Sequence, residues 1–447
     1  MTATFRRPAA TLILVLWAIV VLSLLAGGLS FVVRQDLAIA NIERDRLVAH
    51  NLARAGVERA VAEIMNDTSP SDTLGESWCD NTTDLGDVEL TGGTFSVIRD
   101  GYEAIPIPWY GAGDESTKLN VNVVTREQLL RLPNMTGPIA GAIIDWRDQN
   151  EEAEPDGIER GYYASRAHPY EIRNGPFRTV RELLLVRGVT PELLYGEDRN
   201  VNGLLDPEEN DGDASEPHDN ADGRLDRGWF AYLTVYSYEL NVSGSGQKRL
   251  NLNSAGAQEL STRLGLETWA AESIVKARQQ KKFEHLADLL DVQRDPDQER
   301  ELGRGGDVYV RSEEEKDRPV TQAIFEQIVD ELTLKDEELL PGRININTAP
   351  PEVLATLPGV NAELAEAVVR QRDALVGYTS IGQLLNVSGI TKNRFAELEE
   401  LVTVRSNVFR IHSHGRAASG LTKATIECVV DRRSDVPRVL YWLESSP

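Results

Sequence analysis

The chain has 447 residues, of which 41% are hydrophobic and 26% are charged, an ordinary composition for two to four folded domains. Its 71 acidic and 47 basic residues give a formal net charge of −24, which argues against a nucleic-acid coat because phosphate binding needs local positive charge. Two cysteines and six histidines are too few for a disulfide-stapled scaffold or a cysteine zinc site. No HExxH, GxSxG or GxxxxGK[ST] motif occurs, so the sequence predicts a protein that is not an enzyme and takes no small-molecule substrate.

The N-terminus predicts a membrane anchor. Arg6 and Arg7 precede a charge-free run at residues 9–33, which as a helix is roughly 37 Å long and can span a hydrocarbon core of about 30 Å. The two arginines favour the cytoplasmic side for residues 1–8, so we expect a single pass through a membrane with the rest of the chain facing outward. Apolar residues continue at helical spacing to Met65, which predicts one helix from about residue 10. A cleaved signal peptide followed by a separate helix is the alternative.

Both ends of the remaining chain are rich in predicted strands. Alternating apolar and polar residues bounded by glycine or aspartate occur at 94–98 and again at 408–414 and 439–443. We therefore expect one sheet domain built from residues 34–117 and 405–447. Cys79 and Cys428 both belong to it, and whether they form a disulfide is left open because the sequence does not give their separation.

The middle of the chain repeats one unit three times. A Leu-Asn-Val-Asn-like opening at residues 119–122 recurs at 250–253 and 344–347, each time followed by two predicted helices. The later halves also match one another, at residues 177–184, 283–290 and 378–385. These repeats predict a helical insertion over residues 118–404, with a solvated acidic loop at 148–174 in the first copy.

The third copy, residues 344–404, resembles helix-hairpin-helix modules, including those of DNA-uptake receptors. In such modules a glycine-rich hairpin presents backbone N–H groups to a phosphate beside a basic residue. Here Asn361 replaces the usual second glycine, Glu363 and Glu366 follow, and the copy carries four bases against seven acids. The sequence predicts that the hairpin is kept for packing and does not bind nucleic acid. A membrane-anchored DNA receptor remains the alternative function.

An acidic segment at residues 197–227, with eleven acids against three bases, predicts calcium binding. Residues 198–209 fit the EF-hand loop, with oxygen side chains at positions 1, 3, 5 and 9, glycine at 6, a backbone carbonyl at 7 and glutamate at 12. The expected ligands of this first loop are Asp198, Asn200, Asn202, Leu204, Asp206 and Glu209.

A second, partial loop follows. Asn220, Asp222 and Asp226 stand at positions 3, 5 and 9 around a central glycine. His218 and Trp229 occupy the two end positions, where acidic ligands are expected. Asp211, Asp213 or Asp219 are the substitutes that the sequence offers.

A basic leader, a long N-terminal helix and a globular body resemble the type IV pilin and pseudopilin class. In that class a peptidase cuts before the apolar run, usually after glycine, and a glutamate lies five residues into the mature helix. Here Pro8 precedes Ala9 and Ala10 without a glycine, and no acid occurs before Asp36, so cleavage of the leader is left open. The missing glutamate removes the usual charge partner of a neighbouring subunit, which implies a position at the end of a filament.

The order of the parts resembles one family of this class, the minor pseudopilin K family of type II secretion. The stretches that carry the resemblance are residues 114–122, 144–148 with Tyr162 and Tyr163, and 182–189. The resemblance implies an α+β fold in which a pilin-like transmembrane helix and antiparallel sheet are interrupted by a large helical, helix-hairpin-helix (SAM-like) insertion. It also implies a structural role at the tip of a periplasmic pseudopilus, calcium as a cofactor, and the minor pseudopilins I and J as partners.

Overall fold

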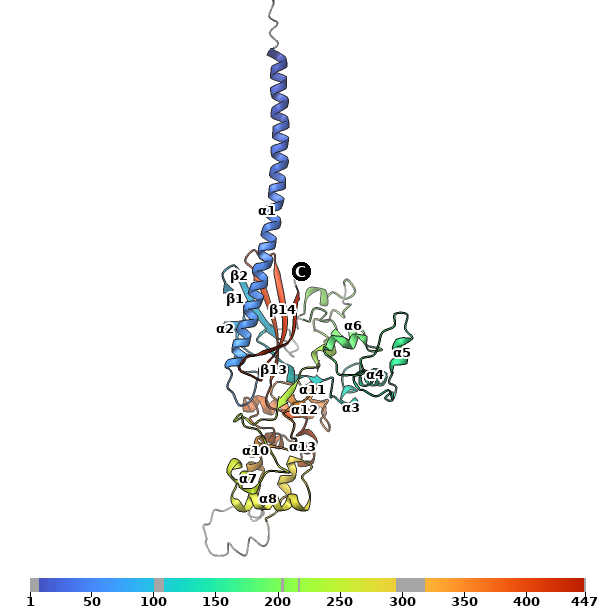
Figure 1. Ribbon diagram of the computed structural model, residues 1–447, viewed down its shortest axis with the longest axis vertical. Coiled ribbons are helices and arrows are strands. Elements are labelled where there is room, and N and C mark those ends of the chain that lie inside the picture. Colours follow the sequence, from blue (N-terminus) through green and yellow to red (C-terminus); the bar gives the residue numbers. More distant parts are fainter. Residues whose placement is uncertain (1–7, 100–107, 202–204, 216–217, 295–317, 446–447) are drawn as a thin grey trace, which may run out of the picture.

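The computed structural model describes residues 8–99, 108–201, 205–215, 218–294 and 318–445. One helix, α1 (Pro8–Asn66), forms the N-terminus and is about 88 Å long at 1.5 Å per residue. Its N-terminal part projects away from a globular body that packs around its C-terminal end (Figure 1). Residues 11–44 are exposed, and the helix is long and apolar enough to cross a membrane. The expectation of a single continuous helix is confirmed.

A seven-stranded antiparallel sheet packs against the C-terminal end of α1. Its main path runs β1-β2-β13-β14-β15, with β3 beside β2 and β4 beside β13. The sheet joins residues from both ends of the chain, as expected. Its strands are β1 (Val88–Leu90), β2 (Gly93–Arg99), β3 (Trp109–Tyr110), β4 (Gly113–Asp114), β13 (Val408–Ala417), β14 (Lys423–Asp431) and β15 (Arg438–Ser445). A short helix, α2 (Thr82–Leu85), precedes β1.

Small residues let α1 lie directly on the sheet. A Cβ atom on Gly415 would meet the carbonyl oxygen of Ala49 at 2.0 Å, so only glycine fits there. The hydroxyl of Ser413 donates to the carbonyl of Ala53 at 2.7 Å, which ties β13 to the helix. Around these contacts the helix buries one apolar face, formed by Leu52, Val57, Ala60 and Ile64.

The cysteines of this sheet domain are separate. Cys79 and Cys428 are both buried and both are free thiols. Burial raises the pKa of each thiol to about 12, so neither is poised to react. The disulfide that the sequence left open is not formed in the structure.

The insertion between β4 and β13 contains three units that close in the same way. Each unit opens and ends with a two-residue strand, and these two strands pair in parallel. The pairs are β5 (Leu119–Asn120) with β6 (Leu233–Thr234), β8 (Leu250–Asn251) with β9 (Leu332–Thr333), and β11 (Ile344–Asn345) with β12 (Val402–Thr403). Residues 119–234, 250–333 and 344–403 are called repeats 1, 2 and 3 below.

Helices fill each repeat, and among the described residues repeat 1 has more of them than repeats 2 and 3. A short helix, η1 (Glu115–Thr117), precedes repeat 1, which holds α3 (Arg126–Leu129), α4 (Gly137–Arg147), α5 (Arg160–Ala164), η2 (Val180–Leu185), α6 (Pro191–Tyr195), η3 (Pro207–Glu209) and η4 (Trp229–Ala231). Repeat 2 holds α7 (Ala257–Leu264), α8 (Thr268–Gln280), η5 (Leu286–Asp291), α10 (Gln322–Ile328) and η6 (Val329–Glu331). Repeat 3 holds α11 (Pro351–Leu354), α12 (Ala362–Leu375), η7 (Ile381–Asn386) and α13 (Lys392–Leu398).

An asparagine amide, buried in repeat 3 and half-buried in repeats 1 and 2, holds the two halves of each repeat together. In repeat 3, the side chain of Asn347 accepts the N–H of Tyr378 at 2.6 Å and donates to its carbonyl at 2.8 Å. An extended segment is thus pinned to a distant one through both backbone groups of a single residue. The same double contact joins Asn122 to Phe177 and Asn253 to Phe283.

An arginine at the end of the second helix completes this framework. Arg278 donates to the carbonyls of Leu252 and Ala255 at 2.8 and 2.7 Å. Arg147 and Arg372 bond the corresponding carbonyls of repeats 1 and 3. Since these carbonyls belong to no regular element, the arginine supplies the hydrogen bonds that they would otherwise lack.

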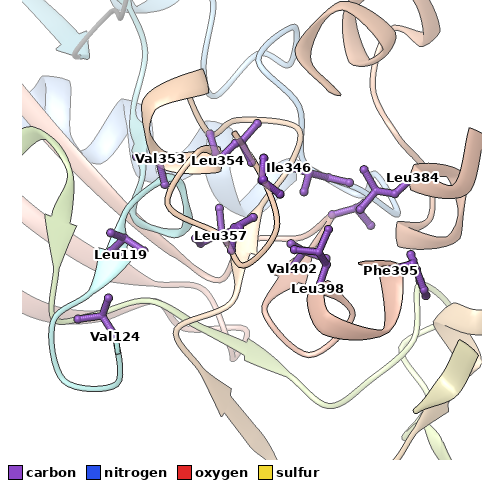
Figure 2. Packing of buried hydrophobic residues seen from close by; sticks show 14 of the residues in the cluster. Leu119, Val124, Ile346, Val353, Leu354, Leu357, Leu384, Phe395, Leu398 and Val402 are labelled. Atoms are coloured by element: carbon purple, nitrogen blue, oxygen red, sulfur yellow. The ribbon is translucent and has the colours of Figure 1, made fainter. Parts of the chain in front are cut away.

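One hydrophobic core runs through the three repeats, and a second lies between α1 and the sheet. Figure 2 shows Leu119 and Val124 of repeat 1 in the same cluster as Leu357 and Val402 of repeat 3. The repeats therefore form one packed body. Repeat 2, with α7 and α8, lies at the end of the body that is farthest from the start of α1 (Figure 1).

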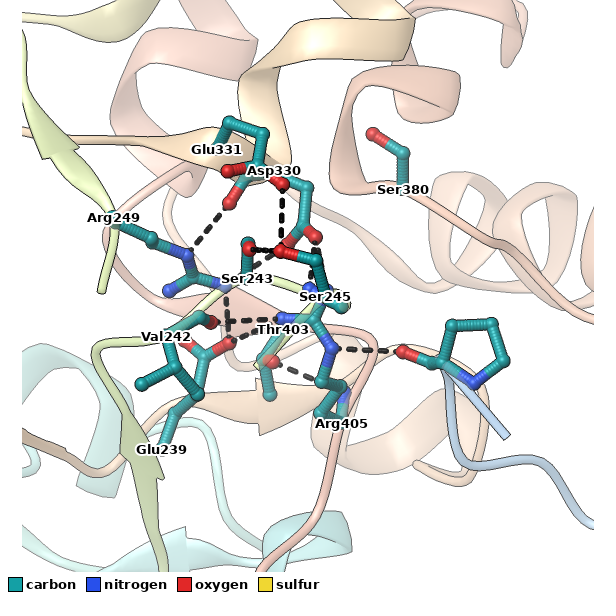
Figure 3. A network of polar contacts seen from close by, with 12 residues as sticks. Glu239, Val242, Ser243, Ser245, Arg249, Asp330, Glu331, Ser380, Thr403 and Arg405 are labelled. Atoms are coloured by element: carbon teal, nitrogen blue, oxygen red, sulfur yellow. Dashed lines mark hydrogen bonds and ion pairs between the residues drawn. The ribbon is translucent and has the colours of Figure 1, made fainter. Parts of the chain in front are cut away.

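A buried charge network joins the ends of the repeats. Glu239, on β7 (Tyr238–Leu240), pairs with Arg249 at 2.6 Å and Arg343 at 2.7 Å (Figure 3). Arg249 also contacts Asp330, which bonds Arg405 as well. Burial alone would raise the pKa of Glu239, but the arginines lower it to about 2, so the carboxylate stays charged. Strand β7 pairs antiparallel with β10 (Leu339–Pro341) beside this network.

Asp114 fixes the insertion to the sheet where the chain leaves β4. It is buried and accepts hydrogen bonds from Thr348 at 2.6 Å, Asn345 at 3.2 Å and Ser406 at 2.5 Å. Asp72, which follows α1, accepts the backbone N–H of Ser406 at 2.7 Å. The third repeat therefore meets the sheet domain at this polar junction, while Arg181 of the first repeat bonds Glu427 of β14 at 3.0 Å.

Candidate functional site

The acidic segment is an insertion inside repeat 1. Repeats 2 and 3 continue from their last helix to the closing strand within a few residues, whereas repeat 1 places residues 196–228 between α6 and η4. An isolated bridge between Gly196 and Arg227 closes the neck of this segment. Gly196 has a φ of +66°, and a Cβ atom there would lie 2.1 Å from the carbonyl oxygen of Asp226. Only glycine allows the two ends to approach so closely.

Three of the predicted ligands of the first loop contact one another or the loop backbone. The amide of Asn200 donates to the carboxylate of Asp206 at 2.7 Å. Glu209 is buried and its carboxylate accepts the N–H groups of Arg199 at 3.2 Å and Asp206 at 3.1 Å. Asp198 is also buried, at the start of the loop. Two predicted ligands, Asn202 and Leu204, lie outside the described residues.

The electrostatics of this loop favour a cation. Burial raises the pKa of the Glu209 carboxyl, and the neighbouring carboxylates of Asp206 and Glu208 raise it further. The hydrogen bonds from the two backbone N–H groups lower this pKa, but the net shift is upward. A raised pKa means that the charged form is disfavoured where it stands. A bound cation would reverse that balance, because it stabilises the carboxylate directly.

Within the described residues, the second loop shares two local features with the first. The amide of Asn220 donates to the carboxylate of Asp226 at 3.2 Å, which repeats the contact between loop positions 3 and 9. Val201 and Ala221 both stand at loop position 4, with positive φ values of +58° and +52°. Asp222 accepts the N–H of Arg224 at 2.8 Å from position 5. Two loops related by sequence spacing are therefore also related in backbone geometry.

The acid that closes the second loop is Glu197, which sequence reasoning missed. Glu197 is buried and accepts the N–H groups of Asn220 at 3.3 Å and Asp226 at 2.9 Å, much as Glu209 does in the first loop. Trp229, at the formal twelfth position, is buried in the core and donates to Pro133 at 2.7 Å. Because Glu197 precedes the first loop, a linear loop template cannot find it. Burial raises its pKa, and the carboxylate of Asp226 adds to that effect.

The substitutes considered from sequence behave differently. Asp219 accepts the N–H groups of Asp211, Gly212 and Ala221 and so shapes the connection between the loops. Asp213 is exposed. Within the described ranges, three acidic groups lie within 4.8 Å of one another only at Asp67, Asp72 and Glu76, where Arg432 already pairs with two of them.

A base from another repeat lies at the hairpin of repeat 3. No base adjoins the hairpin in sequence, but Arg131 of repeat 1 donates to the carbonyls of Ala355, Leu357 and Val360 at 2.8–3.1 Å. The side chain of Asn361 meanwhile accepts the N–H of Leu364 at 2.9 Å and caps α12. Arg131 therefore bonds carbonyl oxygens of the hairpin. The N–H of Leu364, which could otherwise donate to a phosphate, already donates to Asn361.

Family models match three parts of the chain. Residues 113–196 match the model of type II secretion system (T2SS) protein K, first domain. Residues 245–298 and 342–403 match the helix-hairpin-helix motif. The first match begins at β4 and covers the first part of repeat 1, and the other two fall on repeats 2 and 3.

Similarity to individual proteins is weaker. A chain of the GspK-GspI-GspJ complex from the enterotoxigenic Escherichia coli type 2 secretion system aligns over 92% of this chain and 99% of its own, at 11% identity and a TM-score of 0.45. Endonuclease/exonuclease/phosphatase family domain-containing protein 1 is 42% identical over 67 residues in Danio rerio and 36% identical over 64 residues in Homo sapiens. These stretches are 14% of this chain, which spans only 12% and 11% of those two proteins.

Proposed function

We infer from the match of residues 113–196 that the chain belongs to the type II secretion protein K family, and we propose that it is a minor pseudopilin at the tip of a secretion pseudopilus. The matched segment starts where the helical body leaves a sheet that packs on a long N-terminal helix. That combination supports a structural role in protein export, without enzymatic activity of its own. The minor pseudopilins I and J are its partners in this proposal.

The anchor is proposed to lie in the inner membrane. Residues 9–33 contain no charged side chain, and those from residue 11 onward are exposed. Such a surface needs lipid or other helices around it. With Arg6 and Arg7 on the cytoplasmic side, the sheet and the three repeats are periplasmic.

Two features support the proposed position at an end of the filament. The membrane helix has no acid to pair with the N-terminal amine of a neighbour. Repeats 2 and 3 lie beyond the end of the sheet that is far from the start of α1, and repeat 1 lies beside the sheet (Figure 1), so further subunits stacked in the same orientation would compete for their space. The missing charge contact and the bulk of the insertion thus act in the same direction.

Co-purification and imaging test this role. The full chain in detergent, co-expressed with the minor pseudopilins I and J, is expected to elute with both. A label on residues 245–249, between repeats 1 and 2, is expected at one end of each pseudopilus. Label along the whole shaft would contradict a terminal position. A Leu14→Glu variant, or Ile13→Glu if the mature chain begins at Ala9, restores the missing acid but not the space, so it should still mark one end.

We further propose that the acidic segment of repeat 1 binds calcium. The first site uses Asp198, Asn200, Asp206 and Glu209, together with Asn202 and Leu204 outside the described residues. The second uses Asn220, Asp222 and Asp226, with Glu197 as the acid that replaces position 12. Support comes from the shared backbone geometry of the two loops and from the two buried glutamates with raised pKa values. The cation would neutralise the loops and so fix their fold.

The alternative of a DNA-uptake receptor is not favoured. Repeat 3 has three more acids than bases, and the cap of Asn361 on α12 occupies an amide of the hairpin. Arg131 is engaged with carbonyl oxygens. A phosphate would have to displace both contacts in a protein that already carries a charge of −24.

A further inference from the structure

One segment of repeat 1 reverses the charge balance of the chain. Residues 160–187 contain six arginines and two glutamates, a net charge of +4 in a protein whose total is −24. Part of this segment forms a continuous surface, called the arginine–tyrosine face below. Its members are Tyr162, Arg166, Tyr170, Leu184, Leu185 and Arg187.

Tyrosine rings hold the arginines of this face in place. The guanidinium carbon of Arg166 lies 5.7 Å from the ring centroid of Tyr162 and 5.9 Å from that of Tyr170. Arg187 lies over the Tyr162 ring as well, at 5.3 Å. Stacking of this kind leaves the in-plane N–H groups of a guanidinium available to a ligand. Two cationic groups are thus gathered at one ring.

The rings themselves are anchored in the fold. Tyr162 packs edge-on against the buried Tyr163 at a centroid distance of 5.3 Å. The hydroxyl of Tyr170 donates to the carbonyl of Leu185 at 2.6 Å. A ligand would therefore meet a preformed surface and lose little conformational entropy in ordering it.

The charges of the face are not neutralised within the protein. Throughout the described ranges, Arg166, Arg178 and Arg187 form no ion pair with an acidic side chain. Arg173, in the same segment, shows the contrast, because it pairs with Glu182 through two contacts of 2.9 and 3.0 Å. In a chain with 24 more acids than bases, adjacent arginines without an acid are an unusual arrangement.

Exposed apolar side chains belong to the same segment, and Tyr170 is bonded to the backbone of one of these residues, Leu185. Leu185 is 47% exposed, and Leu184 and Tyr162 are each 36% exposed. Arginine and tyrosine beside exposed aliphatic groups make the mixture that protein interfaces favour. An apolar side chain of a partner could pack on the leucines while its acids meet the guanidinium groups.

We propose that the arginine–tyrosine face is the docking site for an acidic segment of a protein partner. Carboxylates of that segment bond Arg166 and Arg187, and an adjoining apolar residue covers Leu184 and Leu185. Charge complementarity selects the partner, since carboxylates accept the paired N–H groups of arginine. A nucleic acid would be repelled by the negative remainder of the chain. The anchoring membrane is remote, because α5 lies at the side of the body away from the apolar part of α1 (Figure 1). The proposal does not depend on the role at the pseudopilus tip.

The test uses the full chain in detergent micelles and a fluorescein-labelled peptide of alternating glutamate pairs and leucine. Binding is measured by anisotropy at low salt, beside a lysine–leucine peptide of equal length. The acidic peptide is expected to bind and the lysine peptide is not. Arg166→Ala combined with Arg187→Ala should weaken binding at least about tenfold. The matched control is Arg370→Ala with Arg433→Ala, which removes the same charge from exposed arginines elsewhere and should change affinity less than about twofold.

Three outcomes would overturn the proposal. One is absence of binding to the wild-type chain. Another is an equal loss in both double variants, which would show that only net charge matters. The third is preferential binding of phosphatidylglycerol vesicles over the peptide, which would assign the face to lipid. Thermal unfolding of each variant, followed by circular dichroism, checks that the fold is retained, and Tyr162→Leu provides a charge-neutral variant that should also weaken peptide binding.

Discussion

Repeats 1 and 3 share one framework but differ in what is added to it. Both close with a parallel strand pair, pin their halves with an asparagine amide and tie the opening segment with an arginine. Repeat 3 adds almost nothing and is packed tightly against the sheet domain. Repeat 1 adds the acidic segment at residues 196–228 and the arginine–tyrosine face.

This difference shows where a repeat can change without losing its fold. The framework contacts lie at the two ends of the unit and in its middle, where the asparagine amide bonds the second half. In repeat 1 the added residues lie between α4 and Phe177, which Asn122 bonds, or between α6 and the closing strand. Stability and ligand chemistry therefore depend on separate residues and can be tested separately.

The largest expected effect is loss of the framework amide. Asn347→Ala leaves both backbone groups of Tyr378 buried without partners, which should cost about 2–4 kcal/mol in the free energy of unfolding. Asn122→Ala and Asn253→Ala should cost less, because these amides are half-buried and water can replace them. Thermal unfolding of the three variants gives the order. An equal loss of stability in all three variants would show that burial does not determine how much this contact stabilises the fold.

Calcium should stabilise repeat 1 alone. At a concentration 100 times the dissociation constant, a ligand that binds only the folded state adds about 2.7 kcal/mol, so the melting temperature should rise with calcium and fall with a chelator. Glu209→Ala and Glu197→Ala should each remove part of the rise. Glu363→Ala, an exposed acid of repeat 3, is the control and should leave it intact. A melting temperature that is the same with calcium and with chelator would refute the metal proposal.

A smaller effect should come from the contact between repeats 2 and 3. The carboxylate of Glu399 accepts the N–H groups of Leu286 and Ala287, and burial raises its pKa to about 7. Because the folded pKa exceeds an unfolded value of about 4.3, its contribution to stability is complete below that value and is lost as the pH rises through 7.

The charge-neutral variant tests this pH dependence. The free energy of unfolding of Glu399→Gln should depend less on pH than that of the wild type. Between pH 5 and 8 it should change by about 1–2 kcal/mol less. Denaturant titrations of both proteins at several pH values provide the measurement. Parallel curves for the variant and the wild type would mean that Glu399 does not titrate there.

Binding of duplex DNA is expected to give the smallest effect. Duplex DNA should not bind the full chain appreciably at low salt, and Arg131→Ala should not change that result, since this arginine faces carbonyls of the hairpin. Mobility-shift assays over a salt series are sufficient. Micromolar affinity with a steep salt dependence would restore the receptor hypothesis.

Much of the fold followed from patterns that are local in sequence. The charge-free run and helical spacing predicted α1, and the repeated Asn residues marked the three units before their hydrogen bonds were known. Those asparagines recur because one amide can serve two backbone groups, a requirement that the sequence expresses directly. The calcium loop at Asp198 stays a prediction of the same kind, since its proposed ligands follow one another along the chain.

Features that depend on distant residues could not be found in this way. Glu197 acts in a loop that starts twenty residues later, and Arg131 reaches a hairpin in another repeat. Arg166 and Arg187 become neighbours only because both meet Tyr162. In each case the packing of the repeats, rather than spacing along the chain, creates the contact.

The way the insertion is attached has a mechanical consequence. Its two ends leave from adjacent rungs of one sheet, where Asp114 on β4 pairs with Phe409 on β13. A force along α1 is transmitted to β13 and β14 through the packing around Ala53 and Gly415. It acts as a shear force between the helix and the strands. The repeats lie beside this path and are joined to the sheet laterally, for example where Arg181 pairs with Glu427. A force along the helix would therefore be carried by the helix and the sheet, while the repeats keep their shape.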